Sequence, residues 1–172
     1  MIITSRSIQL VKNILSLREK KYRRERGEYV VEGLKPVREA VASGRAVRLI
    51  VVSESYRGEL FLPDLVQIVS DSVFEKLSEE VTPQGILAVL ALEEEKLVPP
   101  AGNCLLLDGI SDPGNLGTIL RTANAAGFED IYLIGCADAY SPKCVRASMS
   151  GIFFVRVRSG AAEEVLSVLS DI

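Results

Sequence analysis

Apolar and polar positions along the chain follow two periods, one helical and one extended, and their alternation predicts an α/β protein. A first helix is expected over 7–24, where apolar residues recur at near-helical spacing. The next expected helices are 34–43 and 71–77, the latter with Asp71 as its cap, and the expected strands are 29–31, 47–52, 66–69 and 85–91. We therefore expect an α/β sandwich in this half of the chain.

A polar, proline-rich stretch then interrupts both periods. Residues 93–103 read EEEKLVPPAGN, which is typical of a linker, and we place a domain boundary near 95–102. The alternation restarts with 104–107, a continuous apolar run that predicts a strand buried on both faces. Helices are then expected at 115–126, 142–148 and 161–169, and strands at 131–134 and 152–157.

Composition removes several classes of chemistry. The 172 residues include no histidine, which excludes Ser-His-Asp and Cys-His catalysis and histidine-ligated zinc. The three cysteines have no CxxC spacing, so we expect small core residues in or beside strands, no metal site and a reducing compartment. No apolar run approaches the length of a membrane span and no signal peptide is visible, so a cytoplasmic protein is expected.

Charge is distributed unevenly. Residues 1–26 contain eight basic residues against two glutamates, a local charge of +6 in a chain whose net charge is −3. Such a segment is typical of binding to a phosphate backbone, although a solvated helix end has the same pattern. The residues expected to contact RNA here are Arg18, Lys20, Lys21, Arg23, Arg24 and Arg26.

The stretch 108–121, DGISDPGNLGTILR, predicts a strand end, a Gly/Pro/Asp loop and the first turns of a helix. Ligands of open α/β sheets bind outside the carboxyl ends of strands, where this loop would lie. Helical spacing puts Asn115, Thr118 and Arg121 on one polar arc, while Gly114 and Gly117 allow another backbone or a ligand to approach. A turn followed by a solvated arginine would give the same spacing.

These residues resemble a known family. LLLDGISDPGNLGTILRTANAAGF (105–128) is similar to the first signature of the SpoU-type, or SPOUT-class, RNA 2′-O-ribose methyltransferases. DAYSPKCVRASMSGIFFVRV (138–157) is similar to the second. YVVEGLKPVREAV (29–41) and SDSVFEKLSEEVTPQGILAVL (70–90) resemble the substrate-binding domain of many members, which has the fold of the ribosomal L30e/L7Ae RNA-binding proteins.

The resemblance implies a fold and a reaction. It implies an L30e-like α/β sandwich over 1–97 and the first part of an α/β-knot methyltransferase domain over 103–172. It further implies methyl transfer from S-adenosylmethionine to a ribose 2′-hydroxyl of rRNA or tRNA by a homodimer. Asn115 and Arg121 match first-signature residues tied to catalysis, and Arg146 of the second signature is expected to bind RNA.

Arginine is effectively always protonated, so we expect Arg121 to grip a phosphate and stabilise the developing alkoxide rather than to act as a base. A conventional base would then be Asp108, Asp112 or a substrate phosphate. Ser148 near Lys143 lacks the SxxK spacing of a nucleophile and is interpreted as structural.

The chain departs from the family pattern in places. Ser150 stands where glycine is expected after Ser-Met, and Arg156 where proline is common. The resemblance assigns the knot and most of the cofactor pocket to a third signature, which we do not find before Ile172, so we expect these residues neither to form the knot nor to bind the cofactor well. We also expect an exposed apolar strand edge at 104–107 or 131–134.

Two rival hypotheses remain open at this point. The chain could hold RNA without turnover, as a silent binding module, or it could be a plain α/β interaction domain.

Overall fold

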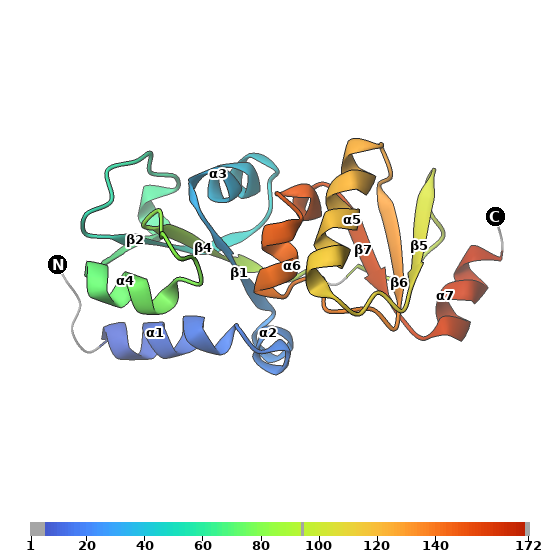
Figure 1. Cartoon of the computed structure of the whole chain (residues 1–172), viewed down its shortest axis with the longest axis horizontal. Coiled ribbons are helices and arrows are strands. Elements are labelled where there is room, and N and C mark those ends of the chain that lie inside the picture. The colour runs from blue at the N-terminus through green and yellow to red at the C-terminus, as the bar shows by residue number, and fades with distance from the viewer. Residues whose placement is uncertain (1–5, 94, 171–172) are drawn as a thin grey trace. The chain divides into compact units, whose positions relative to one another are not determined.

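A computed structural model describes residues 6–93 and 95–170 of the chain (Figure 1). The chain divides into two compact units, residues 1–92 and 93–172, and each has a sheet of its own. Among the helices of the described residues, none combines the length and the apolar character that crossing a bilayer requires. Both units mix helices and strands, which confirms the predicted α/β class.

The first unit is built on a mixed sheet with strand order β1-β4-β2-β3. Its strands are β1 (Glu28–Glu32), β2 (Val47–Ser53), β3 (Val66–Val69) and β4 (Ile86–Ala91). β4 lies between β1 and β2 and is antiparallel to both, whereas β3 runs parallel to β2 at the edge. The central strand is therefore the most apolar, and all residues from Ile86 to Leu90 are buried.

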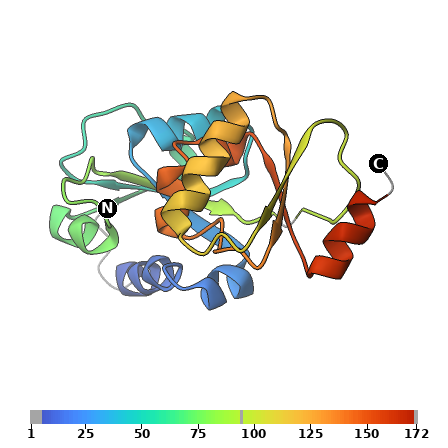
Figure 2. The same ribbon diagram turned by 45° about the vertical axis from the view of Figure 1, so that its right-hand side comes forward.

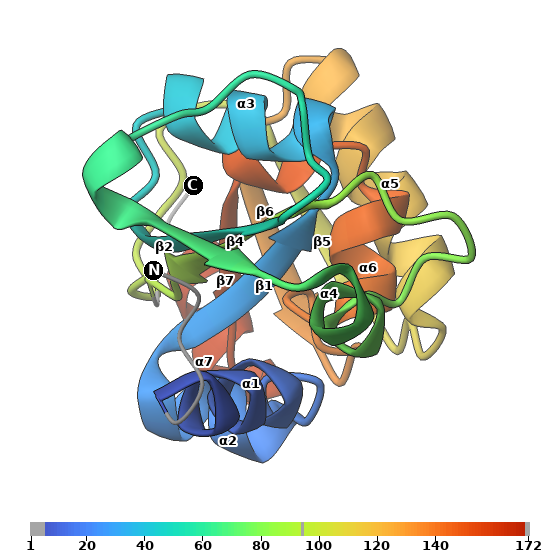
Figure 3. The same ribbon diagram turned by 90° about the vertical axis from the view of Figure 1, so that its left-hand side faces the viewer.

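Helices cover both faces of this sheet (Figure 3). α3 (Leu34–Ala42) lies on one face, while α1 (Arg6–Ser16), α2 (Lys20–Arg26) and α4 (Asp71–Leu77) lie on the other. A short 3₁₀ turn, Pro63–Leu65, leads into β3. The Ser70 hydroxyl, and not the predicted Asp71, caps α4 by accepting a hydrogen bond from the Val73 N–H.

The basic N-terminal segment is not the single helix that its periodicity predicts. α1 ends at Ser16 and α2 begins at Lys20, with Leu17 buried in the turn between them. The Arg23 guanidinium donates to the carbonyl oxygens of Leu17 (2.8 Å) and Arg18 (2.7 Å). Carbonyls at a helix end need such donors, and hydrophobic spacing alone does not reveal where they are found.

The second unit has a three-stranded parallel sheet of order β5-β6-β7. Its elements are β5 (Cys104–Asp108), α5 (Pro113–Ala125), β6 (Asp130–Ile134), α6 (Pro142–Ala147), β7 (Arg156–Ser159) and α7 (Ala162–Leu169). α5 and α6 lie on one side of the sheet and α7 on the other (Figures 1 and 2).

β5 is the edge of this sheet, so the expectation of a strand buried on both faces is wrong. Within residues 6–93 and 95–170 it pairs with β6 alone, and its Leu106 side chain is 39% exposed. The expected exposed apolar edge is therefore formed by β5, whereas β6 is central and nearly fully buried. A continuous apolar run does not distinguish an edge strand from a central one.

The apolar run 152–157 is not one strand. Gly151–Phe153 form a 3₁₀ turn (η2), and β7 begins only at Arg156. The turn follows Met149 and Ser150, whose φ angles of 48° and 70° lie in the left-handed region. That conformation breaks the extended path and favours glycine. Ser150 thus occupies the position where the family pattern led us to expect glycine.

Candidate functional site

The first signature forms the loop after β5 and the whole of α5. Asp112 caps α5: its Oδ2 accepts a hydrogen bond from the Asn115 N–H at 2.8 Å, and Pro113 follows in the first turn. Asp112 Oδ1 also accepts a hydrogen bond from Lys143 Nζ of the second signature at 2.7 Å. The Lys143 ammonium and the Asn115 N–H hold the pKa of the Asp112 carboxyl below its usual value.

The polar arc predicted on α5 exists. Leu116, Leu120 and Ala123 are buried, while Asn115, Thr118 and Arg121 are exposed. Thr118 donates its hydroxyl to the Gly114 carbonyl. The Asn115 amide group and the Arg121 guanidinium make no hydrogen bond or ion pair with any residue in 6–93 or 95–170. One side of the helix therefore offers an amide and a cation to solvent.

Two glycines let α6 and the η2 turn approach α5 closely. A Cβ on Gly117 would lie 2.7 Å from the Ala147 Cβ and 2.9 Å from the Ser148 N. A Cβ on Gly151 would lie 3.0 Å from the Cα of Arg121. Both separations are shorter than carbon contacts allow, so the two signatures are packed backbone to backbone through these glycines.

The second signature is mostly structural in its buried part. Ser148 is completely buried and its hydroxyl donates to the Val145 carbonyl at 2.7 Å, which agrees with the structural interpretation of this serine. Cys144 is also buried, but on α6 rather than in or beside a strand, and burial raises the pKa of its thiol to about 12. Arg146 lies on the exposed side of α6.

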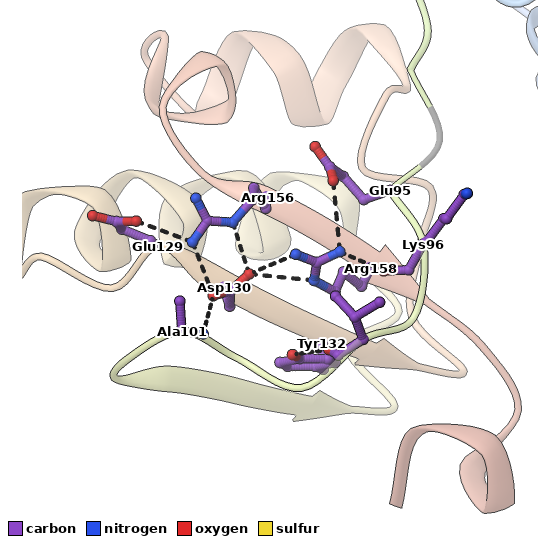
Figure 4. A network of polar contacts seen from close by, with 9 residues as sticks. Glu95, Lys96, Ala101, Glu129, Asp130, Tyr132, Arg156 and Arg158 are labelled. Carbon is purple, nitrogen blue, oxygen red and sulfur yellow. Dashed lines mark hydrogen bonds and ion pairs between the residues drawn. The ribbon is translucent and has the colours of Figure 1, made fainter. Parts of the chain in front are cut away.

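A second polar cluster lies at the start of β6, and sequence reasoning missed it (Figure 4). Asp130 is almost fully buried and accepts hydrogen bonds from Arg156 (2.9 Å) and Arg158 (2.9 Å). These arginines, Arg156 first, hold the pKa of the Asp130 carboxyl well below its usual value. Arg156 also forms an ion pair with Glu129. This arginine, which stands where proline is common in the family, therefore has a structural role.

The same cluster binds the segment predicted as a linker. Arg158 donates to the Lys96 carbonyl and pairs with Glu95 at 3.5 Å. Asp130 accepts from the Ala101 N–H, and the Tyr132 hydroxyl donates to the Val98 carbonyl at 2.7 Å. Residues 95–101 are therefore held against the second unit.

The structure divides the basic segment into two groups. Arg23 was expected from its charge to contact RNA. It is only 3% exposed and its guanidinium donates to main-chain carbonyls, so it is not available to a phosphate. Arg18 donates to the Leu77 carbonyl at the end of α4 and pairs with Glu79 at 3.1 Å. Arg26 donates to the Asn13 side chain at 2.8 Å. These three arginines join α1, α2 and α4.

The other basic side chains of α2 are exposed. Lys20 and Arg24 make no polar contact with the described residues. Lys21 forms a long contact with Glu25, at 3.8 Å, and lies over the Tyr22 ring. Exposed ion pairs of this kind are weak, so an anion can bind the side chains of Lys20, Lys21 and Arg24.

Comparison with known proteins agrees with this organisation. Residues 9–88 match the family model described as the MRM3-like substrate binding domain, and residues 102–171 match the SpoU rRNA Methylase family. A Bacillus subtilis relative, the 23S rRNA (guanosine(2553)-2′-O)-methyltransferase RlmP, is 38% identical over 158 residues, which are 90% of this chain and 63% of the relative.

Two solved structures are similar over nearly the whole chain. The AdoMet-bound rRNA methyltransferase from Sinorhizobium meliloti is 30% identical with a TM-score of 0.83, and the match covers 98% of this chain and 67% of that one. A structure described as an RNA 2′-O ribose methyltransferase is 31% identical with a TM-score of 0.76, covering 99% and 70%. This chain thus spans about two thirds of these proteins, and it belongs to the SpoU rRNA methylase family.

Proposed function

We propose that the chain acts in the S-adenosylmethionine-dependent 2′-O-methylation of ribose in structured RNA, rRNA or tRNA. The observation that supports this most is the exposed Arg121 guanidinium, which has no partner among the described residues and shares one face of α5 with Asn115. A structural arginine would be paired, as Arg158 is. An unpaired one on a helix of the first signature fits a phosphate ligand.

Arg121 binds and orients in this mechanism and does not remove a proton. A guanidinium stays protonated, and its fork of donors matches a phosphate or a developing alkoxide. Methyl transfer to oxygen requires the nucleophile, the methyl carbon and the donor sulfur in line, so orientation accounts for much of the rate. Asn115, six residues earlier on α5, supplies amide hydrogen bonds to the same RNA segment.

Asp108 and Asp112 are the candidate bases among the carboxylates of this site. The Asp112 carboxylate accepts hydrogen bonds from Lys143 Nζ and from the Asn115 N–H. These contacts lower the pKa of Asp112 and make it a poorer proton acceptor. Asp108, at the end of β5, is exposed and has no polar partner in the described residues. The proton of the 2′-hydroxyl therefore goes to Asp108 or to a phosphate of the substrate.

The carboxyl ends of β5 and β6 leave room for the cofactor. Gly109 and Gly135 follow these strands with φ of 69° and 59°, and a Cβ on either would meet no atom within 4 Å. Ligands of parallel sheets bind in this position, so backbone groups of the two loops can supply a few contacts to S-adenosylmethionine, while the resemblance assigns most of its pocket to the third signature. When bound, this cofactor supplies the methyl group.

The first unit binds the RNA in this proposal. We assign residues 1–97 to an L30e-like substrate-binding domain and 103–172 to the methyltransferase domain. Glu95 and Lys96, at the end of the first assignment, are bonded to Arg158 of the second unit. Contact with phosphates rests on Lys20, Lys21 and Arg24, with Arg146 as a contact from the second unit. Arg18, Arg23 and Arg26 instead fix the position of α2 through their hydrogen bonds within this unit.

A homodimer in the cytoplasm completes the proposal. Leu106, Met149 and Phe154 of the second unit are large apolar side chains that are 39%, 54% and 50% exposed, which favours association with a second copy. Cys104, Cys136 and Cys144 have no CxxC spacing, and we propose that they stay reduced in this compartment.

Filter binding to an in vitro transcript of 23S rRNA at several salt concentrations tests the RNA contact. Replacing Lys20, Lys21 and Arg24 with Gln should reduce the salt slope by about two to three. The same loss of charge at Lys35, Arg38 and Arg48, which are exposed elsewhere on this unit, should leave the slope nearly unchanged. Equal effects of the two triple variants would contradict the assignment.

Transfer of labelled methyl from S-adenosylmethionine to the transcript tests the reaction. The product of the complete reading frame should place label on ribose 2′-oxygens, detected as nucleotides resistant to alkaline hydrolysis. RNA binding without any transfer by that protein would instead support a silent binding module, and absence of both would leave only an α/β interaction domain.

A further inference from the structure

Lys143 belongs to the second signature and contacts Asp112 of the first. Its position in the sequence alone does not predict this contact. Its Nζ donates to Asp112 Oδ1 at 2.7 Å, and the other oxygen of that carboxylate accepts from the Asn115 N–H at 2.8 Å. The carboxylate thus connects the first turn of α6 to the first turn of α5. We propose that Lys143 is a positioning residue, which orients Asn115 for RNA through Asp112.

The local packing shows that this contact is built into the site. A Cβ on Gly114 would lie 2.9 Å from Asp112 Oδ2 and 3.1 Å from Lys143 Cε. The ion pair therefore covers the backbone of Gly114, and a larger residue there would displace it. Because Gly114 directly precedes Asn115, the pair determines the path of the chain into the residue whose side chain is exposed.

The Lys143–Asp112 ion pair is exposed to solvent, as expected of a pair that acts in ligand binding rather than in folding. The side chains of Lys143 and Asp112 are 62% and 44% exposed. Exposed pairs contribute little to stability, since solvent screens the charges and two side chains must be ordered. Gly117 already fixes the contact of α5 with α6, and Gly151 fixes its contact with η2. The ion pair therefore constrains the backbone only near Asn115.

A direct contact between Lys143 and RNA is the alternative that the test must separate from positioning. A cation that touches a phosphate lowers the salt slope of binding by about 0.7 to 0.9 when it is removed. A residue that acts through Asn115 leaves this slope unchanged, and its effect disappears once Asn115 is removed. The inference rests on the proposed RNA function of the site.

The experiment is a double-mutant cycle with Lys143→Met and Asn115→Ala, read by the affinity for a 23S rRNA transcript. Lys143→Met keeps the aliphatic stem over Gly114, and we expect it to weaken binding about tenfold, which corresponds to the loss of one well-oriented hydrogen bond to RNA. In the Asn115→Ala background it should change binding by less than about twofold. Lys143→Arg should restore most of the affinity.

Lys96→Met removes one exposed cation from the same unit and should leave binding unchanged. Equal effects of Lys143→Met in both backgrounds, a reduced salt slope, or no effect of Lys143→Met would each overturn the positioning role. A wild-type chain that does not bind the transcript would be recognised before any variant is compared, and would overturn the proposed function itself.

Discussion

The two polar regions of the second unit use arginine in opposite ways. At the start of β6, Arg158 is 6% exposed and is bonded to Asp130, whose side chain is 2% exposed. On α5, Arg121 is exposed and meets no polar partner within 6–93 and 95–170. A buried, paired guanidinium contributes to the fold, whereas an exposed, unpaired one contributes nothing to it and is available for a ligand.

This difference has an energetic consequence that mutation can test. Removing a partner from the β6 cluster should cost stability, and removing a side chain from the α5 face should cost RNA binding only. Asp130→Asn, Gly117→Ala and Ser150→Gly test the structural side of this comparison, in decreasing order of expected effect.

Asp130→Asn should give the largest loss of stability. It leaves the buried Arg158 guanidinium without the Asp130 carboxylate and removes one of the two acidic partners of the partly exposed Arg156. Breaking a buried ion pair costs about 3 kcal/mol or more. Urea unfolding followed by circular dichroism measures the change. Glu129→Gln removes only the 69%-exposed partner of Arg156 and should change the free energy of unfolding by less than about 0.5 kcal/mol. Similar losses in the two variants would contradict the structural role of Asp130.

Gly117→Ala should follow, with a loss of about 1 to 3 kcal/mol. The added Cβ would lie 2.7 Å from the Ala147 Cβ, so α5 and α6 must separate to admit it. Thermal unfolding measures the effect. Gly102→Ala is the control, because a Cβ there meets no atom within 4 Å and its φ is not positive. A neutral Gly117→Ala would show that the helices are not packed backbone to backbone.

Ser150→Gly should be the smallest effect, and it should be favourable. Ser150 has a φ of 70°, a region that costs a residue with a Cβ roughly 1 kcal/mol and glycine much less. We expect a gain of up to about 1 kcal/mol in the free energy of unfolding. Ser167→Gly, on the exposed face of α7, should instead lose about 0.5 kcal/mol. A loss at both positions would rule out strain at Ser150.

Hydrophobic spacing predicted most elements but not where irregular backbone interrupts them. The break between α1 and α2 depends on the Arg23 guanidinium reaching the Leu17 and Arg18 carbonyls, which is a tertiary contact. The η2 turn depends on left-handed backbone at Met149 and Ser150. Periodicity contains neither kind of information. The edge position of β5 is likewise set by pairing, not by its apolar run.

The candidate site was predictable where it depended on helical geometry. The exposed arc of Asn115, Thr118 and Arg121 follows directly from about 100° per residue around a helix whose apolar side is buried. Which basic side chains are free to bind RNA was not predictable from the sequence. Charge composition does not distinguish Arg23, which is buried, from Arg24, which is exposed. Lys143 and Asp130 also lacked a signal, since their partners are distant in the sequence.

The affinity of Arg121→Ala for a 23S rRNA transcript, measured on protein whose unfolding free energy has been compared with wild type, tests the central claim most directly. We expect stability to change by less than about 0.5 kcal/mol, as for an unpaired surface residue. RNA affinity should fall by about tenfold or more, because a charge-assisted hydrogen bond contributes about 1.5 to 3 kcal/mol. Unchanged affinity, or a loss of stability as large as that of Asp130→Asn, would contradict the assignment of Arg121 to RNA.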